Sequence, residues 1–203
     1  NAGEDATVCS GYAATIGGNP TGPGGSSYNW TPPFGLSNST VANPVANPTT
    51  TTTYSVTVTI AGGCTASDDA IITVNAIPVI KFSADPIYGC APLEVNFKDS
   101  TLPAGKSFSW NFGDPTSGTK NKSGIINPSH RFDHEGSYDI ALTVTTFAEC
   151  SATDTIKDMI TVYPIPRADF RYRPLEPTNF NPKADFTDLS SDAVNWKWNF
   201  DDT

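Results

Sequence analysis

The two histidines of this 203-residue chain, His130 and His134, are residues whose type and spacing could serve metal chemistry. Two histidines four positions apart lie on one face of a helix, where both imidazoles can bind one ion. Pro128 and Gly136 flank the pair, however, and both residue types disfavour a helix. We therefore expect a structural role for His130 in its loop and an exposed position for His134.

Three aspartates, Asp99, Asp114 and Asp133, could supply the carboxylate oxygens that Ca²⁺ prefers. Their spacing matches no EF-hand loop. Aspartates at turns also accept hydrogen bonds from nearby backbone N–H groups, and we expect that role for all three. The sequence thus predicts no cofactor, with calcium at these aspartates as the alternative.

Adjacent carboxylates occur at Asp68-Asp69 and Asp201-Asp202, and paired carboxylates perform acid–base chemistry in hydrolases. The first pair is expected to precede an edge-like strand, and the second lies in a repeated turn motif. The chain contains no G-x-S-x-G motif and no P-loop. We therefore predict that the chain is not an enzyme.

The overall composition excludes two further classes of partner. The net charge is -9, and the 12 basic residues do not form the basic stripe that nucleic-acid binding requires. No apolar run approaches the roughly 18 residues that span a bilayer, so we expect no membrane insertion of this segment. The 16 Gly and 17 Pro leave little room for long helices.

Apolar and polar residues alternate with a period of two in several segments, among them 54–60, 95–98 and 138–144. This period places one apolar face inward along a strand. Short alternating strands separated by turns are typical of antiparallel β-sandwiches. The predicted fold class is therefore all-β, with tandem immunoglobulin-like antiparallel sandwiches.

An internal repeat divides the chain. Three segments recur at an offset of 88 or 89 residues: 78–82 with 166–170, 95–99 with 184–188, and 110–114 with 198–202. We predict one module over 1–77, a second over 78–164, and the beginning of a second copy of that module over 165–203. The junctions are short and contain Pro, so we expect the modules to stack as a semi-rigid rod.

The second module carries three motifs in a specific order, at 110–114 (Trp-Asn-Phe-Gly-Asp), 127–132 and 135–138. Together they resemble the PKD domain, an immunoglobulin-like sandwich, although Pro115 and Phe132 depart from its pattern. The structural residues that this resemblance marks are Trp110, Phe112, Gly113, Asp114, Pro128, His130, Gly136 and Tyr138.

The physical properties of these residues agree with that resemblance. Trp110 and Phe112 are two positions apart on one strand, so both should point into the core. Gly113 allows a sharp exit from the strand because Gly tolerates a positive φ. The ring of Tyr138 can fill the edge of the core while its hydroxyl bonds to backbone.

Residues 1–77 carry Val8-Cys9-Ser10-Gly11, Tyr28-Asn29-Trp30-Thr31-Pro32 and Gly63-Cys64-Thr65. They resemble an Ig-like repeat found before PKD domains in very large surface proteins of Bacteroidota, including gliding-motility adhesins and other type IX secretion cargo. The resemblance implies a secreted or cell-surface location. It also implies O-glycosylation at Asp-Ser/Thr motifs, which here contain Ser100 and Thr155.

The four cysteines lie far apart, none in a C-x-x-C motif, which is typical of disulfides formed in an oxidising compartment. Of the three possible pairings, Cys9–Cys64 with Cys90–Cys150 places one bridge inside each complete module. The other pairings cross a module boundary, which stacked modules disfavour. We therefore predict the within-module pairs.

Three functions remain open. The leading hypothesis is a stalk or filament segment of a large adhesin, whose partners are neighbouring modules, other copies of the chain, or surface polysaccharide. Trp30 and Trp196 are candidates for stacking on sugar rings, although we expect most such rings to be buried in the core. The alternative is an accessory spacer or polymer-binding region of a secreted hydrolase. A ligand-binding module is the third, because sandwich loops can bind, although no pocket is marked in the sequence.

Overall fold

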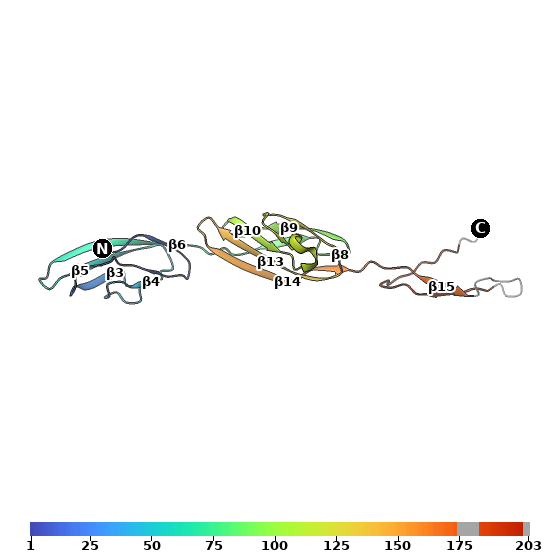
Figure 1. Cartoon of the computed structure of the whole chain (residues 1–203), viewed down its shortest axis with the longest axis horizontal. Coiled ribbons are helices and arrows are strands. Elements are labelled where there is room, and N and C mark those ends of the chain that lie inside the picture. Colours follow the sequence, from blue (N-terminus) through green and yellow to red (C-terminus); the bar gives the residue numbers. More distant parts are fainter. Residues whose placement is uncertain (174–182, 201–203) are drawn as a thin grey trace. The chain divides into compact units, whose positions relative to one another are not determined.

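The computed structural model describes residues 1–173 and 183–200, and β-strands dominate them. Figure 1 shows the strands along the chain. The one helix among the described residues is a short 3-10 helix, η1 (Pro115–Asn121), which follows a strand as part of a turn. The all-β class predicted from the alternating pattern is therefore confirmed.

The N-terminal part contains a four-stranded sheet in the order β1-β6-β5-β3 and a two-stranded sheet of β2 and β4. The strands are β1 (Ala6–Cys9), β2 (Ala14–Thr15), β3 (Ser27–Thr31), β4 (Val45–Ala46), β5 (Thr52–Thr59) and β6 (Thr65–Asn75).

The alternation of apolar and polar residues along β5 explains the hydrophobic core of the N-terminal part. Tyr54, Val56 and Val58 are buried, whereas Ser55 and Thr57 lie partly exposed on the other face. The buried residues pack in one cluster that also contains, from the other strands and loops, Ala2, Ile16, Trp30, Ala46, Ala70 and Ile72. The predicted inward face of residues 54–60 is confirmed for Tyr54, Val56 and Val58 but was wrong for Ile60, which follows the end of β5 and is 42% exposed.

The strand β6 occupies an inner position of its sheet, with β5 on one side and β1 on the other. Asp68 and Asp69 lie within this strand, opposite Val56 and Ser55 of β5. The prediction that the two aspartates precede an edge-like strand was wrong, because the alternating pattern of β5 continues through its hairpin partner. The β1–β6 pairing is parallel, unlike the other pairings of that sheet.

The central part contains a five-stranded sheet in the order β11-β10-β13-β14-β8 and a three-stranded sheet in the order β12-β9-β7. The strands are β7 (Phe82–Asp85), β8 (Tyr88–Cys90), β9 (Leu93–Asp99), β10 (Gly105–Asn111), β11 (Lys122–Ser123), β12 (Ser129–Phe132), β13 (Gly136–Thr146) and β14 (Ser151–Tyr163). As in the N-terminal sheet, one pairing is parallel: β8 runs alongside the end of β14.

The C-terminal part contains two antiparallel strands, β15 (Phe170–Arg173) and β16 (Asp185–Asp188). Trp198 and Phe200 contact Phe186 there, and all three rings are substantially exposed. Their counterparts one repeat earlier, Trp110, Phe112 and Phe97, are fully buried. The second half of the repeated motif, Asp201-Asp202, lies outside the described residues. The module boundaries at 77 and 164 stay predictions.

Candidate functional site

The Trp-Asn-Phe-Gly-Asp segment positions the site in the central part. Trp110 ends the buried face of β10, and Phe112 follows two residues later. Both rings are buried, and both contact Phe97 of β9, with ring centroids 5.5 Å and 5.1 Å away. The prediction that Trp110 and Phe112 point into the core is confirmed.

Gly113 turns the chain out of this strand. Its φ is +66°, and a Cβ atom at this position would lie 2.4 Å from the carbonyl oxygen of Asp139. Only glycine fits both the backbone conformation and the close approach of β13. This turn places the next residue, Asp114, beside His130 of β12.

Asp114 and His130 form a buried pair. Asp114 is 2% exposed and His130 is 5% exposed, and Nε2–H of His130 donates to Oδ2 of Asp114 at 3.1 Å. The other carboxylate oxygen accepts from the hydroxyl of Thr116 at 2.5 Å. The backbone N–H of Asp114 donates to the side-chain oxygen of Asn121 at 2.7 Å. The pair therefore ties the loop that contains η1 to strand β12.

The surroundings of this pair determine the charge of the carboxylate. Burial raises the pKa of Asp114, but the hydrogen bonds from Thr116 and His130 and the electrostatic attraction to the His130 ring together hold the pKa below its ordinary value of 3.8. Asp114 is therefore an anion at neutral pH, with its oxygens already occupied by protein donors.

Aromatic rings cover the imidazole of His130. Phe112 stacks on one face with centroids 4.4 Å apart, and Phe132 contacts it edge-on at 4.6 Å. The ring of Tyr138 continues this row, 4.4 Å from Phe132. A buried and stacked imidazole cannot exchange protons with a substrate, so the geometry supports the structural role predicted for His130. The predicted exposure of His134 is also confirmed.

Tyr138 anchors the beginning of β13. Its hydroxyl donates to the carbonyl oxygen of His134 at 2.7 Å, so the predicted bond to backbone is confirmed. Burial, together with the negative charges of Asp114 and Asp133, raises the pKa of Tyr138. Sequence reasoning missed the matching anchor, Tyr54, which donates to Phe34 O at 2.8 Å. Both tyrosines lie near the start of a long alternating strand, and that shared position was the available signal.

The other residues of the PKD-like pattern lie at strand ends. The carbonyl of Pro128 accepts from the backbone N–H of Phe97 at 2.8 Å, which starts the pairing of β12 with β9. Gly136 is the first residue of β13. Both positions therefore mark the beginning of a strand.

The three candidate calcium ligands each have a separate local partner. Oδ1 of Asp99 accepts from the N–H and hydroxyl of Thr101, and Oδ1 of Asp133 accepts from Nε of Arg131 at 2.7 Å. Asp114 belongs to the buried pair. No group of three or more His, Cys, Asp or Glu side chains suited to a metal occurs within 1–173 and 183–200.

The predicted glycosylation positions and sugar-stacking rings differ in accessibility. Ser100 and Thr155 are both exposed, as an acceptor hydroxyl must be. Trp30 is 1% exposed, and its indole N–H donates to Val41 O at 2.9 Å, so it is a core residue. Trp196 is 54% exposed. Trp196 therefore remains a candidate for stacking on a sugar ring, whereas Trp30 does not.

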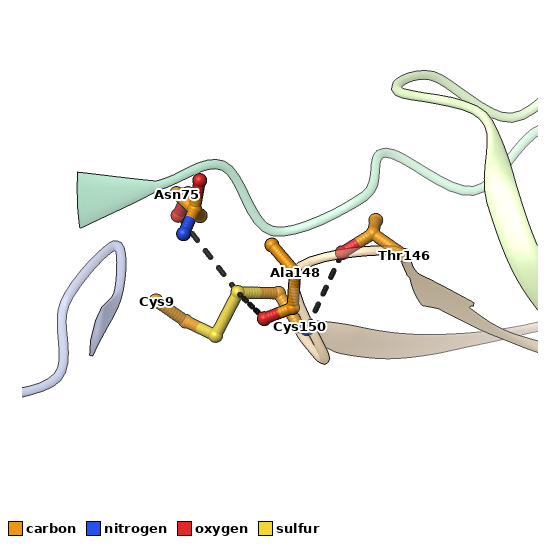
Figure 2. Close-up of a disulfide and its surroundings, with 5 residues drawn as sticks. All are labelled: Cys9, Asn75, Thr146, Ala148 and Cys150. Atoms are coloured by element: carbon orange, nitrogen blue, oxygen red, sulfur yellow. Dashed lines mark hydrogen bonds between the residues drawn. A yellow bond between two sulfur atoms is a disulfide. The ribbon is translucent and has the colours of Figure 1, made fainter. Parts of the chain in front are cut away.

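The disulfide corrects the predicted pairing. Cys9 is bonded to Cys150, with their Cα atoms 5.7 Å apart and 141 positions apart in sequence, whereas Cys64 and Cys90 are free and exposed. Figure 2 shows the bridge beside Asn75 at the end of β6. Both bonded cysteines belong to one compact unit, formed by Asn1–Phe82, Asp99–Ser109 and Leu142–Asp154.

Strand geometry explains why the predicted pairs do not form. Cys9 lies opposite Asn75 at the end of β6, whereas Cys64 directly precedes the start of that strand. An 11-residue strand at roughly 3.3 Å per residue separates the two by about 35 Å, and a disulfide needs Cα atoms within ~7 Å. Cys90 and Cys150 lie at opposite ends of the 13-residue β14 in the same way.

No helix among the described residues is long and apolar enough to cross a membrane.

Comparison with known proteins identifies the central part. Residues 75–162 match the PKD domain family. No curated protein matches the chain. The solved structure of the PKD1 domain of Epp from Vibrio anguillarum is similar to this chain, with 25% sequence identity and a TM-score of 0.35. The similarity covers 43% of this chain and 98% of the PKD1 domain.

Two longer solved structures are also similar in part. The I-band fragment I67–I69 of titin is 12% identical and covers 91% of this chain and 73% of its own, with a TM-score of 0.44. The IG1+IG2 fragment of DIP-gamma is 11% identical and covers 78% and 93%, with a TM-score of 0.38. The motifs at 110–138 and the buried core they form agree with the family match: residues 75–162 are similar to PKD domains, in a chain of tandem Ig-like β-sandwiches.

Proposed function

We propose that this chain is a non-catalytic mechanical segment of a large secreted cell-surface adhesin, where it projects distal domains as part of a stalk or filament. PKD and Ig-like domains are typical of extracellular adhesion and spacer modules, and a disulfide belongs to the same oxidising environment. A role in gliding motility and export by type IX secretion are parts of this proposal. Self-association of copies is a further part.

The observation that carries the proposal is the Cys9–Cys150 bond. It links the last residue of β1 to the turn between β13 and β14, so it joins two different sheets covalently. A force applied to the two ends of the chain passes through this bond and bypasses the 140 residues between the cysteines. Such a bond protects the residues between the two cysteines from extension, which is a requirement of a stalk.

The most chemically suggestive side chains of the described residues support a mechanical role. Asp114 and His130 are buried in mutual contact, and Asp99 and Asp133 bond to their own loops. The Asp114–His130 pair holds a turn against a strand, and Asp99 and Asp133 each bond to a residue two positions away. Calcium at these aspartates and O-glycosylation at Ser100 and Thr155 remain proposals that a mass measurement of the native protein addresses.

Electron microscopy of the parent protein on its native cells, labelled with an antibody against this chain, tests the proposal. We expect the label at intervals along thin, beaded fibres that extend from the cell surface. Label on compact particles with a short tail would contradict the stalk and direct attention to a catalytic domain elsewhere in the parent.

The alternative function, an accessory region of a secreted hydrolase, is favoured by the exposed ring of Trp196. Its neighbours argue against a sugar platform, because Trp198 and Phe200 repeat the buried Trp110 and Phe112. A pull-down on insoluble polysaccharide that a Trp196→Ala change abolishes would support this alternative. Equal retention of both proteins would count against it.

A further inference from the structure

The two free cysteines occupy the same structural positions as the two bonded ones. Cys9 is the last residue of β1, which runs parallel to β6, and it pairs with Asn75. Cys90 is the last residue of β8, which runs parallel to β14, and it pairs with Tyr163. Each sheet therefore carries a cysteine where a short parallel strand meets the end of a long one, the strand-end position.

Backbone hydrogen bonds show the same equivalence. The residue after Cys9, Ser10, donates its N–H to Asn75 O at 2.8 Å. The residue after Cys90, Ala91, donates its N–H to Tyr163 O at 2.9 Å. The residue after each strand-end cysteine therefore makes the same backbone hydrogen bond to the end of the neighbouring long strand.

The other two cysteines lie at matching hairpin turns, the hairpin position. Cys64 follows β5 and precedes β6, and its carbonyl accepts from Ile60 N at 3.1 Å. Cys150 follows β13 and precedes β14, and its carbonyl accepts from Thr146 N at 2.8 Å. Both turns are closed by the same bond across the same number of residues.

The residue before each hairpin cysteine extends the match. Gly63 and Glu149 both have a positive φ, +79° and +62°. Their N–H groups donate to Ile60 O at 2.8 Å and Thr146 O at 3.1 Å. A non-glycine residue adopts such a φ rarely, so the turn at Cys150 keeps the geometry of the turn at Cys64 despite the change of residue.

The observed disulfide joins one position of each kind, the strand end Cys9 and the hairpin Cys150, from two different sheets. The remaining cysteines are one of each kind, the hairpin Cys64 and the strand end Cys90, both exposed. We propose that Cys64 and Cys90 are the two open halves of a second and third bond of this type. Cys64 accepts a strand-end cysteine, and Cys90 a hairpin cysteine, from an adjoining sandwich of the same kind.

Because every bond of this type joins a strand-end cysteine to a hairpin cysteine, each sandwich can bond to other sandwiches of the same kind. Each sandwich presents a strand-end thiol to one neighbour and a hairpin thiol to the other, so the contacts are head-to-tail. The inference depends on the repeated backbone positions and the observed bond, and it holds whether or not the parent is an adhesin.

The chemistry is thiol–disulfide exchange with a small-molecule disulfide as oxidant. A thiolate of Cys90 attacks one sulfur of oxidised glutathione, forms a mixed disulfide and expels one glutathione thiolate. A Cys64 thiolate from a second sandwich then attacks the Cys90 sulfur and expels the second glutathione thiolate. Two protein thiols lose two protons and two electrons, which reduce one glutathione disulfide to two glutathione thiols.

A second copy of the 203-residue chain supplies the complementary cysteine in a direct test. Cys64→Ser leaves only the free strand-end thiol, and Cys90→Ser leaves only the free hairpin thiol. Each variant is incubated alone and in an equimolar mixture in a glutathione redox buffer. Products are separated on a non-reducing gel and their disulfides mapped by mass spectrometry. The Cys64→Ser, Cys90→Ser double variant is the matched control.

We expect the mixture to give a heterodimer linked through Cys90 and Cys64, about tenfold or more above either homodimer, which corresponds to roughly 1.4 kcal/mol of selectivity. Each variant alone should remain largely monomeric, and the double variant entirely so, with Cys9–Cys150 intact in every sample. Monomers only, equal homodimers, random pairing, or dimers linked through Cys9 or Cys150 would each overturn the proposal. None of these results bears on attachment to a surface.

Discussion

Nε2 of His130 lies 3.1 Å from Oδ2 of Asp114, and both side chains are almost completely buried. This hydrogen bond joins the turn after β10 to strand β12, so it connects the two sheets of the PKD domain through a polar contact inside an aromatic core. Residues of these types suggest acid–base chemistry in a sequence, whereas their packing gives them a structural task.

The Asp114 carboxylate should make stability depend on acid. Its pKa is below 3.8 in the folded protein, so its stabilisation is present above the ordinary carboxyl pKa and is lost as pH falls through the lower folded value. Asp114→Asn should lower the free energy of unfolding by about 1–3 kcal/mol at pH 7. The difference from the native protein should shrink below about pH 3.8.

Urea denaturation at pH 7, 5, 4 and 3 checks this dependence. Asp133→Asn is the matched control, because Asp133 forms an exposed ion pair with Arg131 and should contribute about 0–1 kcal/mol. A loss for Asp114→Asn that is equal at every pH would show that the carboxylate charge does not stabilise the domain.

Gly113→Ala should destabilise the PKD domain through two separate effects. The backbone φ of +66° disfavours any side chain, and the new Cβ would lie 2.4 Å from Asp139 O. Gly118→Ala separates these effects, because Gly118 has a similar φ of +61° but nothing within 4 Å of the added atom. We expect about 1–3 kcal/mol for Gly118→Ala, whose φ of +61° and ψ of -123° also disfavour a side chain, and a clearly larger loss for Gly113→Ala. Equal losses in chemical denaturation would show that β13 moves away freely.

The tyrosine anchors should each contribute through one hydrogen bond. Tyr138→Phe removes the donor to His134 O and leaves the ring contacts, so we expect a loss of about 1 kcal/mol. Tyr54→Phe should cost a similar amount through Phe34 O. Tyr88→Phe is the control, because that ring is exposed. Thermal unfolding of all three variants checks the ranking, and a Tyr88→Phe effect as large as the others would refute it.

The sequence predicts the strands and the PKD core well because both arise from local rules. Alternation in residues 138–144 and 54–58 reports burial directly, and the spacing of Trp110 and Phe112 places both rings on one face. The role of His130 could also be anticipated, because its neighbours exclude a helix.

The disulfide could not be predicted in this way, because cysteine pairing depends on which strand ends meet in space. The sequence predicts that Cys9 and Cys64 share a module, but not that β1 runs parallel to β6 and places them at opposite ends of it. A bridge within each module was therefore the natural prediction, and the register of two parallel strand pairs excludes it. The matching role of Tyr54 was missed because its acceptor, Phe34, lies 20 positions away, whereas the acceptor of Tyr138, His134, lies four positions away.

Single-molecule stretching of the chain from its two ends tests the central claim, that a disulfide makes this segment a mechanical element. With the bond intact, residues between Cys9 and Cys150 cannot extend. Reduction, or a Cys9→Ser change, should release an additional contour length of about 500 Å, because the two cysteines are 141 positions apart in sequence and an extended chain spans roughly 3.6 Å per residue. The same total contour length before and after reduction would contradict the account, because it would show that no bond between Cys9 and Cys150 limits the extension of the chain.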